Sequence, residues 1–413
     1  MDQTNEYIVG VELGGAWVSC LVAAVENEEL NVLGWGRQPS RGFARGELVD
    51  LEAAAACVEA AITAAEGSAF VRAQTVFVGA ASSQYRGLNS RGCVPVLRED
   101  RLVTDQTRRS AIEAAERISL PNEREIVDVV PQTFTVDEMR WVENPVGMAG
   151  SRLEAEVHLA TDAACYLHNV LGAVAKTHCK AEGMVFKPFA AAQAVLTKDE
   201  RRLGALVIDI GGATTNIILI RDGAPRFSAV IPLGGRHLTY DIAICLNVSV
   251  EQADDIKVTR AFACRSQISP EQHRKTFEIR TTDGSIQTVS IGKVCSIIEC
   301  RVEEMLSIVR KEVSRAGYGD AYHAGVVLTG GTAKTDGIAE AGRRVFGCPV
   351  RVGRPHIRSR LGQQLEDPSW ATCVGILQCG LQQRRLGHAD GPARRGTVHR
   401  ILSRGIDWAR AAF

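Results

Sequence analysis

One short stretch contains more small polar residues than a chain reversal requires. Residues 207–218 read VIDIGGATTNII, in which Asp209 lies in an apolar run that precedes two glycines and two threonines. A hairpin turn needs only a dipeptide such as Asn-Gly. Backbone N–H groups at glycines can surround a phosphate because no Cβ blocks its approach, and threonine hydroxyls add donors. We therefore expect a phosphate site formed by Gly211, Gly212, Thr214 and Thr215, with Asp209 holding a hydrated Mg²⁺.

A stretch near the start of the chain repeats this pattern. Residues 10–22 read GVELGGAWVSCLV, in which Glu12 takes the position of the aspartate and Gly14 and Gly15 form the tip. In a duplicated α/β protein with a cleft between its halves, the two tips would face each other across a phosphate. Glu12 and Asp209 would then both reach the metal ion through water. Each stretch could also be an ordinary hairpin, and this alternative is stronger for the first one.

A third glycine pair follows another apolar run. Residues 326–337 read VVLTGGTAKTDG, with Gly330, Gly331 and Thr332 opening a segment of helical pattern. Such a turn suits the adenosine end of a nucleotide, or a phosphate at a helix N-terminus. By itself this third motif is weak. The three motifs in order along one chain are a much stronger indication of nucleotide binding.

Alternating strands and helices must position these turns. Apolar runs predict strands at 7–13 and 17–25, and the segment 204–223 repeats their apolar–glycine–apolar pattern. The Ala-rich segment 51–67 and the segment 302–317 end at glycine as helices do. Such alternation favours α/β layers around buried sheets. Glu154, Glu156 and His158 alternate along one predicted strand, where the sequence favours a solvated face over a metal site.

Composition excludes several classes of protein. The 413 residues suffice for two or three domains, and 48 basic residues balance 48 acidic ones, so no overall field points to nucleic acid. The twelve cysteines are scattered without C-x-x-C pairs, which predicts reduced thiols rather than a disulfide framework. The polar N-terminus is no signal peptide, and no run of 18 apolar residues would span a membrane. The default expectation is a cytoplasmic protein.

The end of the chain suggests a membrane contact. Residues 384–396 are rich in Gly, Pro and Arg and are predicted to be a flexible linker, and residues 397–413 have an amphipathic helical pattern. The apolar arc of that helix includes Val398, Ile401, Leu402, Ile406, Trp408 and Phe413. A basic amphipathic helix with Trp and Phe suits anionic lipid headgroups. The alternative is a terminal helix docked on the protein's own core.

Several motifs together resemble one family of bacterial cell-division proteins, FtsA, within the actin-like ATPase superfamily. The similar segments are NPVGMAGSRLEAEVHLAT (144–161), LNSRG (88–92), VIPLGGRHLTYDIAICL (230–246) and AGVVLTGGTAKTDGIAE (324–340). The match runs in order from about residue 7 to residue 380. It implies an α/β, actin-like (ribonuclease H-like, duplicated) two-lobed fold with a nucleotide cleft and an inserted FtsA-type subdomain.

The resemblance also implies domain boundaries. Lobe 1 would comprise residues 1–85, 161–195 and about 355–383, with the inserted subdomain at 86–160. Lobe 2 would comprise residues 196–354, including an outer subdomain at about 240–324. The linker at 384–396 and the membrane-targeting helix at 397–413 would follow.

The family's functional residues carry over to matching positions here. The resemblance implies ATP and Mg²⁺ as ligands and assigns the nucleotide site to Gly14, Gly15, Asp209, Gly211, Gly212, Thr214, Thr215, Gly234, Gly235, Gly330, Gly331 and Thr332. Asp254 and Lys257 of ADDIKV would lie near ribose and base, although they could equally be a surface pair at i, i+3. Gln193 would orient the attacking water, which a glutamine can do without acting as a base.

Departures from the family pattern bear on hydrolysis. The first loop has Glu12, Gly15, Ala16 and Trp17 where the family has Asp, a Thr/Ser pair and Lys, and Asn216 replaces an aspartate of the second loop. These changes remove phosphate contacts. We therefore expect nucleotide binding with slow hydrolysis at most.

The resemblance finally implies a role and partners. It predicts a protein that polymerises head to tail on the cytoplasmic face of the cell membrane at the division site, binds anionic lipids and recruits later division proteins. Arg301 matches the region where the family receives the C-terminal peptide of the tubulin-like FtsZ. Two alternatives are an actin-like scaffold of pilus assembly and a small-molecule kinase of the same superfamily. Phosphoryl transfer to sugars would indicate the kinase.

Overall fold

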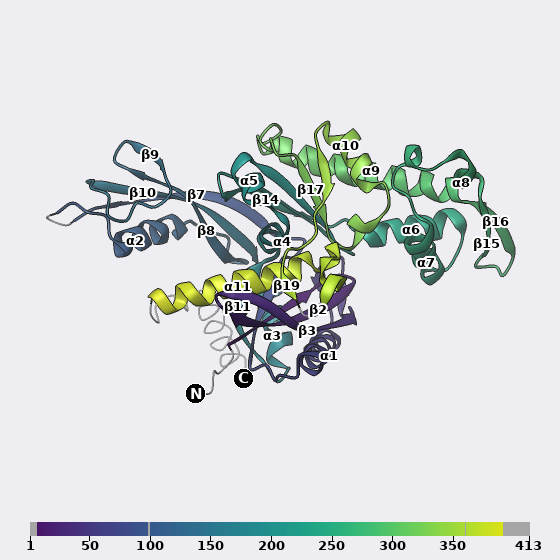
Figure 1. Ribbon diagram of the computed structural model, residues 1–413, viewed down its shortest axis with the longest axis horizontal. Helices are drawn as coiled ribbons and strands as arrows, with labels where there is room; N and C mark the ends of the chain where they lie inside the picture. The colour runs from purple at the N-terminus through teal and green to yellow at the C-terminus, as the bar shows by residue number, and fades with distance from the viewer. Residues whose placement is uncertain (1–5, 98–99, 360, 391–413) are drawn as a thin grey trace.

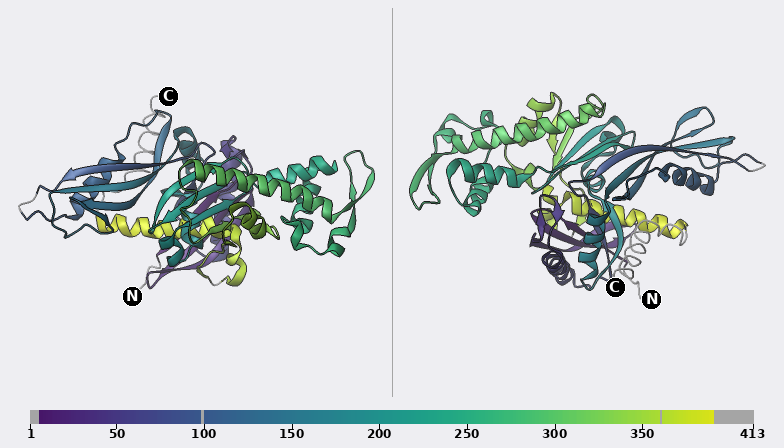
Figure 2. Two further views of the ribbon diagram at one scale, coloured as in Figure 1. Left: turned by 90° about the horizontal axis from the view of Figure 1, so that it is seen from above. Right: turned by 180° about the vertical axis from the view of Figure 1, so that it is seen from behind.

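The computed structural model describes residues 6–97, 100–359 and 361–390. Two sheet-based lobes lie one above the other, and two further subdomains extend from the upper lobe in opposite directions (Figure 1). The two subdomains are also seen to extend in opposite directions from above and from behind (Figure 2). The upper lobe is lobe 2, and the lower lobe is lobe 1.

Lobe 1 is built on a six-stranded sheet with the strand order β11-β6-β1-β2-β3-β19. Its strands are β1 (Tyr7–Leu13), β2 (Trp17–Glu26), β3 (Glu29–Pro39), β6 (Thr75–Ala80), β11 (Lys180–Phe186) and β19 (Arg358–Ser359). Helices α1 (Leu51–Ala69) and α3 (Ala164–Ala175) lie below this sheet, and α11 (Ala371–Asp390) lies above it beside α4 (Lys187–Val195), as Figure 1 shows. A small hairpin, β4 (Phe43–Ala44) with β5 (Glu47–Leu48), precedes α1.

Helix α1 shows how local sequence produces this packing. Asp50 caps the helix by accepting a hydrogen bond from the Ala53 N–H at 3.1 Å. Its alanine-rich face packs closely on β3, where a Cβ added to Gly36 would lie 2.0 Å from the Ala61 carbonyl oxygen. The glycine is therefore required for the helix to approach the sheet this closely.

Lobe 2 repeats the strand arrangement of lobe 1. The order β17-β12-β13-β14 corresponds to β6-β1-β2-β3, with an antiparallel hairpin at the centre and a parallel strand beside it. The strands are β12 (Ala205–Ile210), β13 (Thr215–Arg221), β14 (Ala224–Ile231), β17 (Val326–Thr329) and β18 (Val350–Val352). Helices α5 (Lys198–Leu203) and α10 (Ile338–Phe346) belong to the same lobe. This repetition is the duplicated two-lobed fold that the sequence predicted.

The inserted subdomain continues the sheet of lobe 2. Its strands β7 (Arg86–Pro95), β10 (Arg152–Ala163), β8 (Arg124–Val136) and β9 (Met139–Val142) join at β14 through one pair, Ala229 with Arg86. Helix α2 (Asp105–Glu116) packs on this extension. The outer subdomain contains α6 (Gly235–Leu246), α7 (Val250–Arg260), α8 (Pro270–Arg274), β15 (Thr276–Arg280), β16 (Ile286–Ser290) and the long α9 (Ile291–Arg315).

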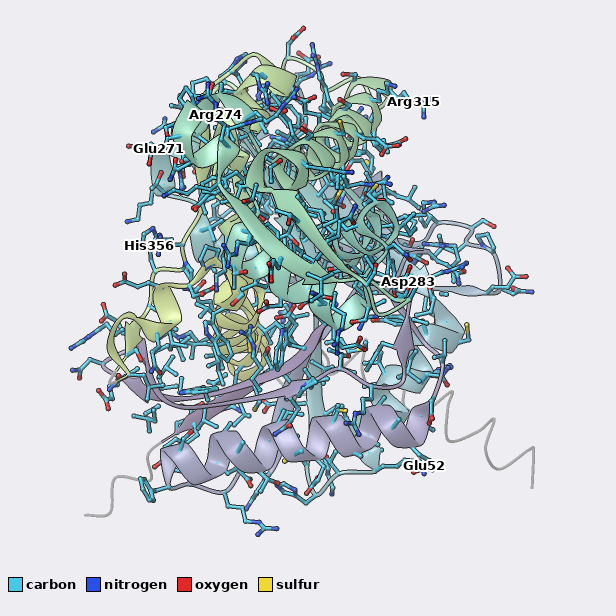
Figure 3. The ribbon with its side chains drawn as sticks, turned by 90° about the vertical axis from the view of Figure 1, so that its right-hand side faces the viewer. Glu52, Glu271, Arg274, Asp283, Arg315 and His356 are labelled. Carbon is cyan, nitrogen blue, oxygen red and sulfur yellow. The ribbon has the colours of Figure 1, made fainter. Side chains whose placement is uncertain are left out.

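Charged side chains cover the outside of this assembly. In the side view, Glu52 on α1 and Arg315 at the end of α9 lie at opposite ends of the molecule (Figure 3). Among the described helices, none is both long and apolar enough to cross a bilayer. The twelve cysteines are all unpaired thiols, as their scatter along the sequence predicted.

Two sequence-based expectations were wrong. The linker predicted at 384–396 is helical in its first part, because α11 continues to Asp390 and Arg384 donates to Glu182 Oε1 at 2.7 Å and to the Tyr7 carbonyl at 3.0 Å. His158 does not lie on a solvated face. It is buried, and its ring contacts Asn89 Oδ1 at 2.7 Å and Ser228 Oγ at 2.5 Å.

Candidate functional site

The first hairpin tip lies between β1 and β2. Gly14 N–H donates to the Trp17 carbonyl at 3.0 Å and closes the turn. Glu12 is partly exposed as a residue, but its carboxyl group is buried, and this burial raises its pKa to about 7. The nearby charge of Lys187 opposes that rise, and the Lys187 ammonium donates to the Leu13 carbonyl at 2.9 Å.

The second tip, between β12 and β13, is more completely hydrogen-bonded. Asp209 Oδ2 accepts from Asn216 Nδ2 at 2.9 Å and from Thr372 Oγ1 at 3.0 Å. Thr215 Oγ1 donates to the Leu233 carbonyl at 2.8 Å, and the buried Thr214 lies against Gly46. The Thr215 hydroxyl is therefore already engaged within the protein.

The two tips meet across the cleft, as the sequence predicted. A Cβ added to Gly15 would lie 2.4 Å from the Cβ of Ala213, and one added to Gly212 would lie 2.6 Å from the Cβ of Ala16. Real Cβ atoms do not approach so closely, so each glycine faces a methyl group of the opposite tip. The lobes touch at the residues predicted to border the phosphates.

The third glycine turn joins the same cluster. Gly330 has φ 86°, and a Cβ there would lie 2.3 Å from Asp209 Oδ1. Thr332 Oγ1 donates to the Gly211 carbonyl at 3.2 Å. The turn continues as a short 3₁₀-helix, Gly331–Lys334, and α10 begins only at Ile338.

The start of α6 closes this cluster from the outer subdomain. Gly235 N–H donates to the Gly211 carbonyl at 2.9 Å, and Arg236 N–H donates to the Gly212 carbonyl at 2.8 Å. A Cβ on Gly234 would lie 2.7 Å from the Gly211 carbonyl oxygen. The first tip, the third glycine turn and the start of α6 therefore all contact the second tip or the Asp209 that precedes it.

Asp254 and Lys257 lie one step further out, on α7. They form the i, i+3 ion pair that the sequence allowed, and both hydrogen-bond Thr239 of α6, at 2.9 Å and 2.8 Å. Burial opposes ionisation of Asp254, but the hydrogen bond and charge of Lys257 hold its pKa below the ordinary value. Their contact with ribose and base stays a prediction.

Gln193, the predicted water-orienting residue, is tied to a neighbour. Its Oε1 accepts from the Arg201 guanidinium, which also donates to the Gln193 carbonyl at 2.7 Å. The amide oxygen of Gln193 is thus already hydrogen-bonded to Arg201. The role of Gln193 in orienting water stays a prediction.

Sequence reasoning missed two cations at the first tip. Besides Lys187 on α4, Arg37 of β3 lies close enough to Glu12 to lower its pKa. The Arg37 guanidinium stacks on Trp370 at 4.2 Å and lies 5.6 Å from the Trp17 ring. Both cations come from elements remote from the glycine motif, which is why no local pattern revealed them. They supply positive charge where the first loop lacks its lysine.

A cavity of about 920 Å³ opens beside this group. It lies between Trp35 and Arg37 of lobe 1 and the start of α10 in lobe 2, and it is lined by 333–340 among other segments. The cavity has charged walls, because the ion pair of Lys334 with Asp367 (2.6 Å) borders it. Space for a ligand therefore exists beside the third glycine turn.

The donor set at the centre of the cleft fits a hydrated Mg²⁺. Asn216 Oδ1 is buried and has no hydrogen-bond partner among the described residues. With the carboxylates of Glu12 and Asp209, it offers only oxygen acceptors, which suit the waters around a hard cation. No other group in the described structure satisfies this buried acceptor.

Arg301, the predicted partner-binding residue, lies on α9 of the outer subdomain. Its guanidinium forms a two-pronged ion pair with Asp241 of α6, with the Nη2–Oδ1 distance 2.9 Å, and it also pairs with Glu304. These contacts stabilise its charged form and raise its pKa. Tyr240 and Ile244, one helical turn apart on α6, are exposed.

The membrane-binding residues predicted at 398–413 lie outside the described residues. Nothing structural bears on Val398, Ile401, Leu402, Ile406, Trp408 or Phe413. Their amphipathic pattern stays the observation on which that prediction depends.

Comparison with known proteins agrees with this geometry. The family model "Cell division protein FtsA" matches residues 206–375, and the model "SHS2 domain inserted in FTSA" matches residues 82–161. The cell division protein FtsA of Pseudomonas aeruginosa is 34% identical over 386 residues, which cover 93% of this chain and 92% of that protein. The chain belongs to the FtsA family. FtsA of Escherichia coli K12 is 32% identical over 99% of both chains.

Solved structures show that this FtsA-family chain has the actin-like fold. A PilM–PilN complex of type IV pilus biogenesis has a TM-score of 0.64 at 18% identity, covering 91% of this chain and 98% of the other. MreB5 of Spiroplasma citri bound to AMPPNP has a TM-score of 0.55 at 14% identity, covering 94% and 99%. Identities this low indicate the fold alone. The inserted-domain match and the FtsA relatives favour cell division over the pilus alternative.

Proposed function

We propose that this FtsA-family protein binds ATP with Mg²⁺ in the cleft, polymerises on the inner face of the cytoplasmic membrane and tethers FtsZ filaments there. It would also recruit later division proteins. The observation that carries the nucleotide part is that the first hairpin tip, the third glycine turn and the start of α6 all contact the second tip or the adjoining Asp209.

Each part of the cleft would have its own role. Backbone groups of the two tips would bind phosphates, and Gly330 to Thr332 would border the adenosine. Glu12, Asp209 and Asn216 would hold the waters of Mg²⁺, which supplies charge neutralisation at the phosphates. Lys187 and Arg37 would provide the positive charge that Trp17 cannot.

Hydrolysis would be slow. Gln193 has its amide oxygen engaged by Arg201, and a glutamine cannot accept a proton from water. The Asn216 amide likewise cannot serve as a base. ATP would therefore act mainly as a ligand that holds the lobes together, and its hydrolysis would contribute little.

Filaments would connect the nucleotide to the membrane. A head-to-tail contact between copies is heterologous and gives open filaments rather than rings. One amphipathic tail of the kind predicted at 397–413 binds lipid weakly, but many tails along a filament bind together with high effective concentration. Polymerisation would thus convert weak lipid contacts into stable attachment.

The outer subdomain would receive the FtsZ peptide. Exposed Tyr240 and Ile244 offer apolar contacts on α6. Arg301 lies near them because it pairs with Asp241, the residue that follows Tyr240. An acidic peptide group would compete with Asp241 for the guanidinium.

The test is co-sedimentation with vesicles containing anionic lipid, with and without ATP and Mg²⁺. We compare the full chain with a version ending at Gly396 and with two matched variants, Ile401→Glu on the apolar arc and Ser403→Glu on the polar side. These two add the same charge. The full chain and Ser403→Glu should pellet, more so with ATP, and filaments should be visible by electron microscopy.

The opposite result has a clear meaning. If the truncated chain pellets as well as the full chain, the tail is no membrane anchor and the tethering proposal is wrong. If vesicle binding is unchanged by ATP and ATP does not bind in equilibrium dialysis, the nucleotide part is wrong while the membrane part stands.

A further inference from the structure

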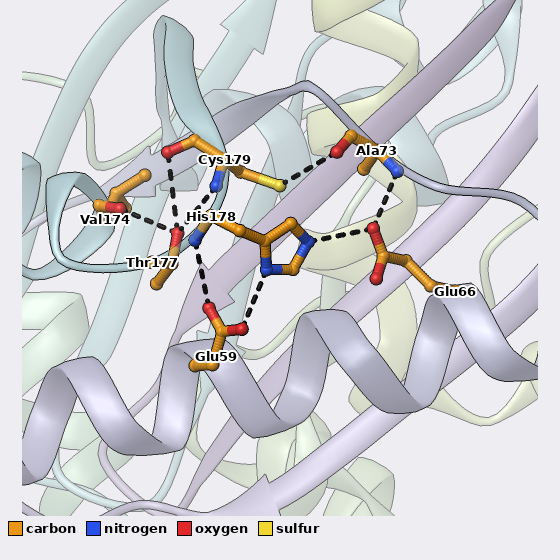
Figure 4. Close-up of polar contacts among 7 residues, drawn as sticks. All are labelled: Glu59, Glu66, Ala73, Val174, Thr177, His178 and Cys179. Carbon is orange, nitrogen blue, oxygen red and sulfur yellow. Dashed lines mark hydrogen bonds and ion pairs between the residues drawn. The ribbon is translucent and has the colours of Figure 1, made fainter.

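A second cluster of metal-binding side chains lies at the opposite end of lobe 1. Strands β6 and β11 run parallel to β1, whose C-terminal end carries the first hairpin tip. The turn before β11 therefore lies at the end of the sheet remote from that tip. Here the His178 ring lies between Glu59 and Glu66 of α1, and the Cys179 thiol points to the Ala73 carbonyl (Figure 4).

Three different donor atoms come together in this cluster. A ring nitrogen of His178, a carboxylate oxygen of Glu66 and Cys179 Sγ all lie within 4.8 Å of one another. The Nε2 to Glu66 Oε1 distance is 2.9 Å. A nitrogen, an oxygen and a sulfur atom so arranged match the ligand types of Zn²⁺, which binds His, Asp or Glu, and Cys at about 2.0–2.3 Å.

The surrounding contacts already orient these donors. Glu59 Oε1 contacts His178 Nδ1 at 2.7 Å, and Glu59 Oε2 accepts from the His178 N–H at 3.2 Å. A carboxylate on the second ring nitrogen is the usual partner of a zinc-bound histidine, because it fixes the tautomer that presents Nε2 to the metal. Glu59 and Glu66 are two helical turns apart and lie on one face of α1.

Backbone groups fix the other two donors. Ala73 N–H donates to Glu66 Oε1 at 2.7 Å, and Cys179 Sγ donates to the Ala73 carbonyl at 3.4 Å. Thr177 Oγ1 bonds the Val174 carbonyl at 2.7 Å and accepts from the Cys179 N–H at 3.2 Å, which holds the turn in shape. The dashed lines of Figure 4 show these contacts converging from α1, the Ala73 segment and the turn.

We propose that Glu66, His178 and Cys179 form a zinc site, with Glu59 supporting His178 and water in the fourth position. Binding requires the thiolate and the neutral imidazole, so the thiol proton and any second ring proton pass to the solvent. The zinc ion then links α1 to the turn before β11, two segments far apart in the sequence. Its role is to hold the base of lobe 1 together.

The same contacts allow a simpler arrangement without metal. A protonated His178 between Glu59 and Glu66 would form two ion pairs and need no thiol. Cys179 distinguishes the two arrangements, because its sulfur contributes to a metal site but not to the charged pair. The experiment therefore depends on the sulfur.

The test uses the full chain with the exposed Cys93, Cys165, Cys245 and Cys300 changed to serine, so that surface thiols bind no metal. After addition of zinc and dialysis, we expect one zinc per chain by mass spectrometry. Cobalt added in place of zinc should give a sulfur-to-metal charge-transfer band. Cys179→Ser should remove the band, and His178→Gln should release the zinc.

Two further variants sharpen the result. Glu59→Gln leaves all three ligands in place and should weaken zinc affinity about 10–100-fold. Glu52→Gln is the matched control, since it lies on the same helix and pairs with Lys176 of the same turn at 2.6 Å without touching a donor (Figure 3). It should bind zinc as the parent does.

Two outcomes would overturn the proposal. The parent could retain no zinc and give no cobalt–sulfur band, or Cys179→Ser and His178→Gln could keep their zinc. In the first case, a loss of thermal stability in His178→Gln would show that His178 acts only through its charged pairs with Glu59 and Glu66. Because the parent's cobalt spectrum reports the thiolate directly, the proposal can fail even if a variant does not fold.

Discussion

Gly15 of lobe 1 and Ala213 of lobe 2 touch across the cleft, and a Cβ on Gly15 would lie 2.4 Å from the Cβ of Ala213. The reciprocal contact, Gly212 against Ala16, is equally close at 2.6 Å. Each tip thus fits against the other only because one of the two facing residues has no side chain. A larger side chain at either glycine would overlap the opposite tip.

Gly212→Ala should force the tips apart. The added methyl overlaps the Cβ of Ala16, and overpacking of this kind costs about 1–3 kcal/mol. Relief by opening the cleft would separate the phosphate-binding groups and weaken ATP binding about tenfold or more, since 1.4 kcal/mol corresponds to a factor of ten. Isothermal titration with ATP and Mg²⁺ measures this.

The control is Gly67→Ala, a glycine of α1 with nothing within 4 Å of its added Cβ. This variant should bind ATP normally, and it should be at least as stable as the parent because alanine is the better helix residue. If Gly212→Ala binds ATP as tightly as the parent, the tips do not border the nucleotide.

The glycine tips could be predicted because their chemistry is local. The spacing of Asp209, the two glycines and the threonines is contained in one turn, and the turn repeats near the N-terminus. The fold then follows from the repetition, because the same four-strand order is built twice. The repeated turn motif in the sequence and the repeated strand order of the two lobes therefore agree.

The remaining features of the site depend on long-range packing. Lys187 and Arg37 reach the first tip from α4 and β3, and no spacing in the sequence brings them there. His158 alternates with two glutamates as a surface residue would, yet β14 covers it. The adjacent His178 and Cys179 meet their carboxylates only because α1 packs beside the turn before β11.

Lys187→Met should weaken ATP–Mg²⁺ binding. The lysine is buried, and its charge favours ionised Glu12 against the burial that raises the Glu12 pKa to about 7. Without that charge Glu12 is more fully protonated at pH 7.5, and the first loop loses a cation. We expect affinity to fall about tenfold, the equivalent of one pKa unit, or 1.4 kcal/mol.

Lys198→Met, at the exposed start of α5, is the matched control for this loss of positive charge. Titration calorimetry with ATP and Mg²⁺ measures the affinity of both variants. Equal affinity in the two would show that Lys187 is only a structural lysine bonded to the Leu13 carbonyl.

Stability should fall at acid pH because of His158. Burial lowers the pKa of His158 to about 4 from 6.5, so the folded chain keeps the ring neutral where the unfolded chain protonates it. As pH falls from 6.5 to 4 the unfolded state binds the extra proton, and folding stability decreases by up to about 3 kcal/mol. Above pH 6.5 the contribution is constant.

Urea unfolding at several pH values between 7.5 and 4.5 measures this slope. His158→Gln lacks the titrating ring and should lose less stability than the parent over that range, even if it is less stable at pH 7.5. His323→Gln, at an exposed histidine, should follow the parent. Parallel slopes for the parent and His158→Gln would contradict the buried neutral histidine.

Arg301→Ala should weaken binding of the FtsZ C-terminal peptide, if the outer subdomain receives it. The partly buried guanidinium would pair with an acidic group of the peptide, and truncating one partner of such an interfacial charge pair costs about 2–5 kcal/mol, so affinity should fall more than tenfold. Asp241→Asn removes the internal competitor and should leave peptide binding as tight as in the parent or tighter. Arg315→Ala, at the exposed end of the same helix, is the control for charge (Figure 3). Fluorescence anisotropy with a labelled peptide measures all three, and equal losses in Arg301→Ala and Arg315→Ala would mean that the peptide responds only to overall charge.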